Sequence, residues 1–301
     1  MRWQSIKKNI EKNIEKNSLC FQPKQKNTEP ANMSAMKKIL LLLIGCCLLP
    51  LGCVATDSNT RSGREPGQPV LRVGITADAR PMAFHDHGRI AGLEADFAKG
   101  LAEYTHRKLV FVELPWPKQI PALLAGKTDI IMSAMTVTGA RNYRISFAEP
   151  YMVTGQIALV RLRDVGKFSD GLTDLLSPVV KVGTVKATTG DLLILKNKAK
   201  GTVLHFGDAD HGVQALFDGT IDAFVYDLPM NFYLGAKYGD KGLVPVSVPL
   251  SREYLAWGIR KEDRQLLDSA NGYLQNLRDS GKLQQMIIHW IPFYRSLYNS
   301  R

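Results

Sequence analysis

Cysteine is missing from most of this chain. All four cysteines lie within the first 53 of the 301 residues, at Cys20, Cys46, Cys47 and Cys53. The 248 residues that follow therefore cannot form an internal disulfide, a cysteine metal site or a cysteine nucleophile.

The chain also lacks a strong charge pattern over most of its length. The formal net charge is +11, but residues 1–53 carry nine basic and three acidic side chains, which leaves 30 basic and 25 acidic ones in the remainder. No basic stripe interleaved with aromatic residues is present, so nucleic-acid binding is not expected. No Ser/His/Asp spacing suggests a hydrolase. A length of 301 residues allows one or two domains, and the 45% hydrophobic content is ordinary for a globular protein.

A short apolar run near the amino terminus predicts export. Two lysines follow Met36, and the apolar run from Ile39 to Leu51 is too short to span a bilayer as a mature helix. This pattern is typical of a secretory signal, and we exclude residues 1–35 from the fold as an upstream extension.

The end of that run resembles the lipobox of bacterial lipoproteins, in which the cysteine is lipidated and the leader is removed. Both "LIGC", ending at Cys46, and "PLGC", ending at Cys53, fit the pattern. We favour Cys53 because a longer apolar core precedes it and a polar tether follows it, although "LIGC" is closer to the consensus. An ordinary signal peptide and an uncleaved anchor are the alternatives.

Strand and helix patterns alternate from Pro69 onward. This order predicts an α/β fold with two lobes, each a mostly parallel sheet flanked by helices. The last 40 residues are expected to be helical. Strands are expected at 70–76, 108–114, 129–135, 179–185, 202–206 and 221–226, and the other helices at 92–107, 118–126, 190–199, 210–218 and 229–238.

Polar side chains follow the third expected strand directly. Thr136 and Thr138 offer hydroxyl groups, and Arg141 offers a planar guanidinium that suits a carboxylate. Ligands of open parallel sheets bind beyond the carboxyl ends of the strands, where these residues lie. The alternative is an exposed arginine in a loop.

The second half of the chain offers a matching set. Thr188, Thr189 and Gly190 are expected at the start of a helix, where free amide groups favour an anion. Simple capping of the helix by Thr189 is the alternative. Tyr226 and Asp227 end a strand, where the acid can hold a cation or cap the next helix.

Several motifs in order resemble one known family. "LRVGI…P.AF", "G.EADFAKGLAE", "MTVT..R...ISFAEPY", "VGTVKATTGD" and "IDAFVYD.P" are similar to the bacterial extracellular solute-binding proteins of family 3, over about residues 70–293. These are the polar amino-acid receptors of ABC importers. The resemblance implies a type II periplasmic-binding-protein fold, with two lobes that two crossing strands join and that close like a hinge.

The resemblance also sets the expected organisation of the chain. It implies a lipid-anchored monomer in the periplasm or cell envelope, without a cofactor or metal, that delivers its ligand to the permease and ATPase of an importer. The expected parts are the extension and lipoprotein signal (1–53), a flexible tether (54–68), lobe 1 (69–157 with 253–301) and lobe 2 (158–252).

The resemblance assigns roles to residues that grip an amino-acid backbone. Arg141 matches the arginine that holds the α-carboxylate, and Thr136 matches the threonine that contacts both ends of the backbone. The carbonyl of Ala134 would accept from the α-ammonium, which Asp227 would pair with from lobe 2. Thr189 would receive the carboxylate at the start of a helix.

Further matches surround that grip. Gly190 matches a second helix-start group for the carboxylate, and Trp116 matches an aromatic wall. Lys186 matches a lobe-2 lysine near the ligand side chain. Tyr226 is a candidate aromatic platform from lobe 2.

Three positions depart from the family pattern. Ala79 stands where an aromatic residue is usual, and Thr76 where an aspartate is common, so the side-chain end of the pocket differs. Arg80 lies beside the proline, where it would recognise an acidic or amide side chain or form a solvated rim.

The sequence also leaves room for a metal site and for two other functions. "FHDHG" at 84–88 places two histidines around an acid, but its turn chemistry favours a hairpin tip over a metal site. Cyclohexadienyl dehydratases resemble this family but carry a catalytic glutamate where this chain has Met230. A free-standing ligand sensor that docks on a receptor is the other rival.

The choice of lipidation site is directly testable. Cys53→Ser should release soluble protein, because it removes the only sulfur that the anchor would use. Membrane fractionation and labelling with a fatty-acid analogue measure this, with Cys46→Ser as the matched control. Continued acylation of Cys53→Ser would assign the anchor to Cys46.

Overall fold

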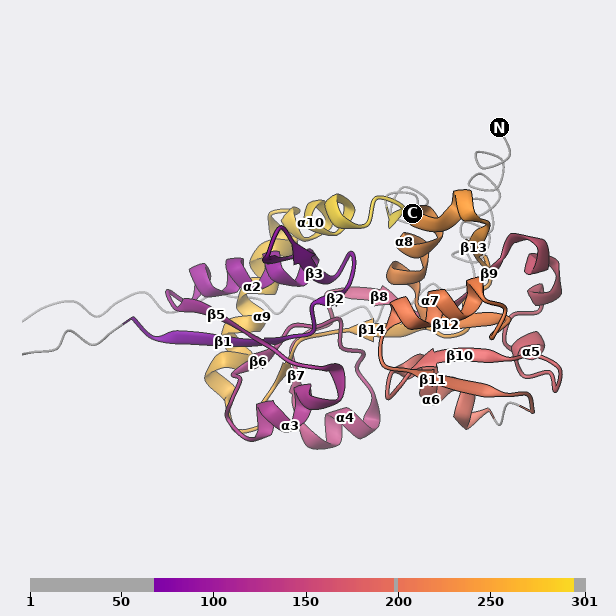
Figure 1. Ribbon diagram of the computed structural model, residues 1–301. Coiled ribbons are helices and arrows are strands. Elements are labelled where there is room, and N and C mark those ends of the chain that lie inside the picture. The colour runs from indigo at the N-terminus through magenta and orange to yellow at the C-terminus, as the bar shows by residue number, and fades with distance from the viewer. Residues whose placement is uncertain (1–67, 198–199, 295–301) are drawn as a thin grey trace, which may run out of the picture.

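The computed structural model describes residues 68–197 and 200–294 and places them around two five-stranded sheets (Figure 1). The signal-like segment, with Cys46 and Cys53, lies outside these residues. Within them, no helix combines the length and the apolar character that a membrane span requires.

The first sheet combines residues from both ends of the described chain. In spatial order its strands are β5 (Lys108–Glu113), β1 (Val70–Ile75), β6 (Ile130–Ile131), β15 (Gly258–Ile259) and β7 (Ser146–Phe147). Leu71, Val73 and Ile75 of β1 have no exposed surface. Such a strand is typical of a sheet whose two faces are both covered.

Helices cover this sheet on both sides. α2 (Leu93–Tyr104) buries Phe97 and Leu101, which are one helical turn apart, and it contacts the two C-terminal helices. α3 (Gln119–Leu124) lies on the opposite side in Figure 1. The other helices of this lobe are η1 (Trp116–Lys118), α4 (Gly139–Arg144), α9 (Arg264–Asp279) and α10 (Lys282–Trp290).

The second sheet lies beside the first. Its strands, in spatial order, are β11 (Val203–Phe206), β10 (Val182–Val185), β12 (Ala223–Asp227), β9 (Gln156–Arg161) and β13 (Leu243–Pro245). Its helices are η2 (Leu162–Phe168), α5 (Leu172–Leu175), α6 (Thr189–Lys196), α7 (Ala209–Phe217), α8 (Leu228–Tyr238) and η3 (Gly239–Lys241). We call the two sheets with their helices lobe 1 and lobe 2; the exact lobe boundaries stay a prediction.

Both sheets are mixed but mostly parallel, as expected, because in each of them a single strand runs against the other four. β5, β1 and β6 are parallel, but β15 runs antiparallel to β6 and β7. In lobe 2, β9 likewise runs antiparallel to β12 and β13. β9 and β15 directly follow the segments that cross between the lobes, so no crossover helix turns them into parallel register. The third expected strand is also short, because the chain leaves the sheet after Ile131.

The two crossing strands implied by the family resemblance are present. β8 (Met152–Thr154) and β14 (Glu253–Leu255) form an antiparallel pair that lies between the two sheets in Figure 1. The chain passes closely at Gly155, where a Cβ atom would lie 2.0 Å from the carbonyl oxygen of Ser251.

The histidine segment at 84–88 forms a hairpin tip, as predicted. β3 (Ala83–Asp86) pairs with β4 (Arg89–Ala91), and β2 (Asp78–Ala79) completes this small sheet. The two turn residues have φ angles of 47° and 76°, as a two-residue hairpin loop requires. No group of three His, Cys, Asp or Glu residues in the described part of the chain could hold a metal.

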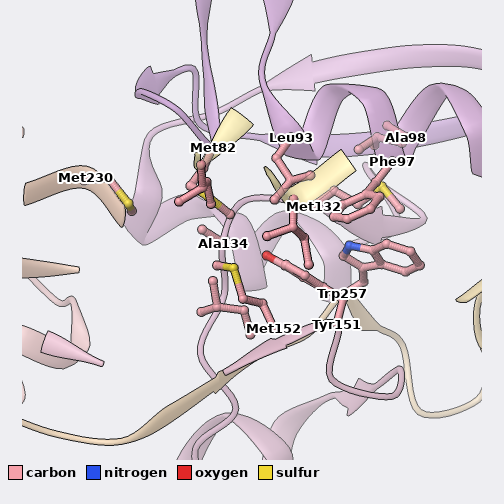
Figure 2. Close-up of a cluster of buried hydrophobic side chains, with 14 of the residues drawn as sticks. Met82, Leu93, Phe97, Ala98, Met132, Ala134, Tyr151, Met152, Met230 and Trp257 are labelled. Carbon is pink, nitrogen blue, oxygen red and sulfur yellow. The ribbon is translucent and has the colours of Figure 1, made fainter. Parts of the chain in front are cut away.

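A buried carboxylate joins the core of lobe 1 to the crossing segments. Glu94 has no exposed surface and accepts hydrogen bonds from the Tyr151 hydroxyl at 2.6 Å, the Ala134 amide at 2.6 Å and the Trp257 indole at 3.2 Å. Figure 2 shows Tyr151 and Trp257 packed with Phe97 next to Ala134. Burial raises the pKa of Glu94 to about 7, against the opposing effect of the three donors.

This pKa predicts a pH-dependent stability. The folded protein keeps the Glu94 proton up to about pH 7, whereas the unfolded chain releases it near the ordinary pKa of 4.5. The unfolding free energy should therefore fall as the pH rises through this window, by about 3 kcal/mol relative to Glu94→Gln. Denaturant unfolding of both proteins across the window measures the difference. A constant difference would contradict the shifted pKa.

Candidate ligand-binding site

A pocket lined by residues of both lobes lies between the lobes, beyond the carboxyl ends of the parallel strands. Its empty volume is about 540 Å³, which includes solvent space at its open mouth. The residues that line it come from both lobes: Thr76, Asp78, Ala79, Met82, Ala83, Trp116, Ser133, Ala134, Thr136 and Arg141 from lobe 1, and Val185, Thr188, Thr189, Gly207, Tyr226, Asp227 and Met230 from lobe 2.

The loop after β6 presents the lobe 1 side of this cleft. Ala134 adopts a left-handed conformation with φ 51°, which is uncommon for a residue with a Cβ atom. Thr138 then caps α4 through the backbone amide of Arg141. The guanidinium of Arg141 donates to the Thr136 carbonyl at 2.8 Å and lies 5.0 Å from the centre of the Trp116 ring. The arginine is thereby held at the wall of the cleft.

Helix α6 presents the lobe 2 side. Thr188, rather than Thr189, caps this helix, because its hydroxyl accepts from the backbone amide of Asp191. The hydroxyl of Thr189 is consequently left for the cleft. Gly190 packs against Gln156 instead, since a Cβ atom there would lie 2.5 Å from the Gln156 side-chain oxygen.

Asp227 stands at the end of β12 and is 7% exposed. Its Oδ1 atom accepts from the Gln156 side-chain amide at 2.9 Å. It makes no side-chain capping bond to α8, so the capping alternative is wrong. Burial and the nearby charge of Glu253 raise the pKa of Asp227 to about 7. The ionised carboxylate of Asp227 would stabilise a cation that enters the cleft.

Glu253, at the start of the second crossing strand, was missed by sequence reasoning. Its Oε2 atom accepts from the hydroxyls of Thr136 and Thr189, both at 2.8 Å, and from the amide of Gln156 at 3.3 Å. Ser251 donates to the other oxygen at 2.7 Å. One carboxylate therefore links lobe 1, lobe 2 and the crossing strand. No local motif marks this residue, because its partners are far away in the sequence.

The lobes also meet directly across the cleft. The Trp116 indole donates to the Ala187 carbonyl of lobe 2 at 3.0 Å. The Thr136 and Thr189 hydroxyl oxygens are 3.5 Å apart. The structure thus has its two lobes in contact around the site.

Most of the predicted site residues converge on this cleft. Those that line it are Thr76, Trp116, Ala134, Thr136, Arg141, Thr189, Tyr226 and Asp227. Lys186 is exposed and lies outside the lining, and the buried Gly190 also lies outside it. Arg80 also lies outside it, with its guanidinium 3.4 Å from the centre of the Phe84 ring and 3.7 Å from Asp86.

Sequence reasoning also missed several lining residues. Asp78 and Met82 line the cleft, as does Met230, which the sequence analysis considered only as the position of the dehydratase glutamate. Ser133 lines it too, and its hydroxyl accepts from the backbone amide of Thr76 at 3.0 Å. The sequence contains a signal for Asp78, because this residue lies between Thr76 and Ala79, and both of these depart from the family pattern at the side-chain end of the pocket.

Comparison with known proteins identifies the family. The sequence profile of the bacterial extracellular solute-binding proteins, family 3, matches residues 71–293. The chain belongs to this family. This solute-binding protein is 27% identical over 257 residues to a probable histidine-binding protein of Neisseria gonorrhoeae, covering 83% of this chain and 94% of that protein. It is also 27% identical over 261 residues to the arginine-binding extracellular protein ArtP of Bacillus subtilis (strain 168), covering 85% and 98%.

Solved structures confirm the two-lobed fold of this solute-binding protein. The ancestral amino acid-binding protein AncCDT-1, a precursor of cyclohexadienyl dehydratase, has a TM-score of 0.68 and 34% identity. The match covers 74% of this chain and 95% of that one. The curated relatives are binding proteins rather than enzymes.

The proximity of Glu253 to Asp227 gives a prediction that needs no ligand. Glu253→Gln removes a negative charge that raises the pKa of Asp227, so this pKa should fall below its value of about 7. Carbon-13 NMR titration of the Asp227 carboxyl measures it. Glu262→Gln, which changes an exposed acid, is the matched control and should leave the titration unchanged. An Asp227 pKa near 3.8 in the unaltered protein would show that burial and Glu253 do not raise it.

Proposed function

We propose that this protein captures an amino acid between its lobes and delivers it to the membrane permease of an ABC importer. The observation that carries the proposal is the placement of two opposite charges in one cleft. Arg141 comes from lobe 1 and Asp227 from lobe 2, and both line the same pocket. An amino-acid backbone carries the complementary pair, a carboxylate and an ammonium.

The orientation of the ligand follows from these charges. Its α-carboxylate would pair with Arg141 and lie near the start of α6, where backbone amides and the helix dipole favour an anion. Its α-ammonium would pair with Asp227 and donate to the Ala134 carbonyl. Because the groups belong to different lobes, they contact the ligand together only when the lobes close. Binding and closure are therefore one equilibrium.

The pocket is poorly suited to the chemistry of a dehydratase. At the position where those enzymes carry a catalytic glutamate, this chain has Met230, which is 4% exposed and lines the pocket. A thioether cannot donate or accept the proton that such an elimination moves. Loss of a positioned acid typically costs about 10² to 10⁴ in rate. This agrees with a binding protein and not an enzyme.

We further propose that the protein works as a monomer in the cell envelope, anchored by a lipid on Cys53. Supporting this are the signal-like segment and the polar tether that precedes the first strand. A tethered receptor stays near the permease while its lobes open and close. The Cys53→Ser experiment tests the anchor separately from the ligand site.

The arginine provides the central test. A thermal-shift panel of the twenty amino acids first identifies the best ligand, since a ligand at a hundred times its Kd should add about 2.7 kcal/mol of stability. Arg141→Ala should then weaken that ligand by about 2–5 kcal/mol, roughly 30- to several-thousand-fold. Calorimetry measures the loss. It should be similar for every ligand with an α-carboxylate, because Arg141 reads the shared backbone.

Arg144→Ala is the matched control, because this arginine lies on the same helix and is exposed. The affinity of the Arg144→Ala protein for the best ligand should stay close to that of the unaltered protein. Circular dichroism establishes that both variants are folded. Unchanged affinity in a folded Arg141→Ala protein would refute the proposed site.

A further inference from the structure

The cleft contains one more negative charge than an amino-acid backbone can balance. The carboxylate and guanidinium groups among its lining residues are Asp78, Arg141 and Asp227. In the proposed function, the ligand carboxylate neutralises Arg141 and the ligand ammonium neutralises Asp227. Asp78 is left without a partner of opposite charge.

Glu253 does not alter this count at the ligand. Its carboxylate is already satisfied by neutral donors, with hydroxyls from Thr136, Thr189 and Ser251 and the amide of Gln156. It also lies outside the pocket lining. Its negative charge makes the cleft still less favourable for a ligand with a second carboxylate.

Asp78 has no ion-pair partner among the residues that the structure describes. Across residues 68–197 and 200–294, no lysine, arginine or histidine forms an ion pair with it. The nearby Arg80 instead packs on Phe84 beside Asp86, and Lys186 lies outside the lining. Both basic residues that the sequence offered for the side-chain end therefore lie away from it.

Asp78 is exposed at the cleft, and the charges that shift its pKa belong to acids. Partial desolvation raises its pKa, and the charges of Asp208, Asp210 and Glu113 add to this rise. Asp208 belongs to lobe 2 and is held by His211 at 2.8 Å, so the two lobes present acids to the same region. A cation there would be stabilised by charges on both sides of the cleft.

Aromatic and apolar groups line the same pocket as the two acids. Tyr226 lines the pocket, and its pKa is raised by burial first and then by the charges of Asp227, Asp78 and Asp208. Met82, Met230 and Trp116 also line the pocket. An apolar stem that connects an α-ammonium to a distant cation fits such a channel.

From this arrangement we infer that the pocket selects an amino acid with a cationic side chain, a guanidinium or an ammonium, which pairs with Asp78. The inference rests on the proposed function, because it needs the ligand backbone at Arg141 and Asp227. It goes further by assigning the side-chain end of the site and a residue that determines its specificity.

The experiment compares ligands of equal length that differ in charge. Calorimetry with L-arginine against L-citrulline, and with L-lysine against L-norleucine, isolates the side-chain cation. Of L-arginine and L-lysine, the one that binds more tightly should bind at least about tenfold better than its uncharged analogue. Asp78→Asn should remove most of that difference. The affinity of the uncharged analogue should change little. Asp240→Asn, which alters an exposed acid remote from the cleft, should leave both affinities unchanged.

Each outcome has a separate meaning. Tighter binding of a neutral or acidic amino acid than of arginine and lysine would overturn the inference while leaving the proposed function intact. So would a charge preference that survives Asp78→Asn. Failure of all twenty amino acids to bind the folded protein would instead refute the proposed function, and the inference with it. Because the ligand pairs are compared on the unaltered protein first, a decision does not depend on the variant folding.

Discussion

One oxygen atom of Glu253 holds the two sides of the cleft together. It receives a hydroxyl from Thr136 in lobe 1 and another from Thr189 in lobe 2, while its own backbone belongs to the crossing strand β14. Hydrogen bonds to a charged acceptor are roughly twice as strong as neutral ones. The same carboxylate therefore contributes to the contact between the lobes and to the geometry of the site, together with the Trp116 to Ala187 hydrogen bond.

A second buried carboxylate performs the equivalent task inside lobe 1. Glu94 holds the amide of Ala134, the residue whose carbonyl faces the proposed ammonium position. Its other partners, Tyr151 and Trp257, lie next to the two crossing strands. The left-handed backbone at Ala134 is costly by itself, and it persists because these hydrogen bonds determine it. The ligand loop is thus fixed by the same segments that must move when the lobes open.

Buried acids also explain why closure and binding are expected to be coupled. Glu253 and burial together raise the pKa of Asp227 to about 7, so the cleft without a bound cation favours a proton on this residue near neutrality. A bound ammonium would replace that proton, because it stabilises the ionised carboxylate. Arg141 experiences the opposite cost, since burial lowers its pKa and only the charges of Asp227 and Glu253 counteract this effect. A zwitterion that neutralises both groups relieves both costs at once.

The sequence by itself determined the α/β class, the parallel strands β1, β5, β6, β10, β11 and β12, and several residues that line the cleft. Local chemistry was sufficient there, because strand ends, helix starts and the turn at 87–88 are encoded by neighbouring residues. The motif spacing likewise predicted Thr136, Arg141 and Asp227, although their roles stay predictions.

Tertiary structure decided the rest. Glu253 is 117 residues from Thr136 and 64 from Thr189, so no pattern along the chain could place it between them. The fold likewise decided that Arg80 lies outside the cleft lining and that Asp78 lines it without an ion pair. It also decided that β9 and β15 run antiparallel to their neighbours. Each depends on which distant side chains and strands the fold brings close, and only the folded chain contains that information.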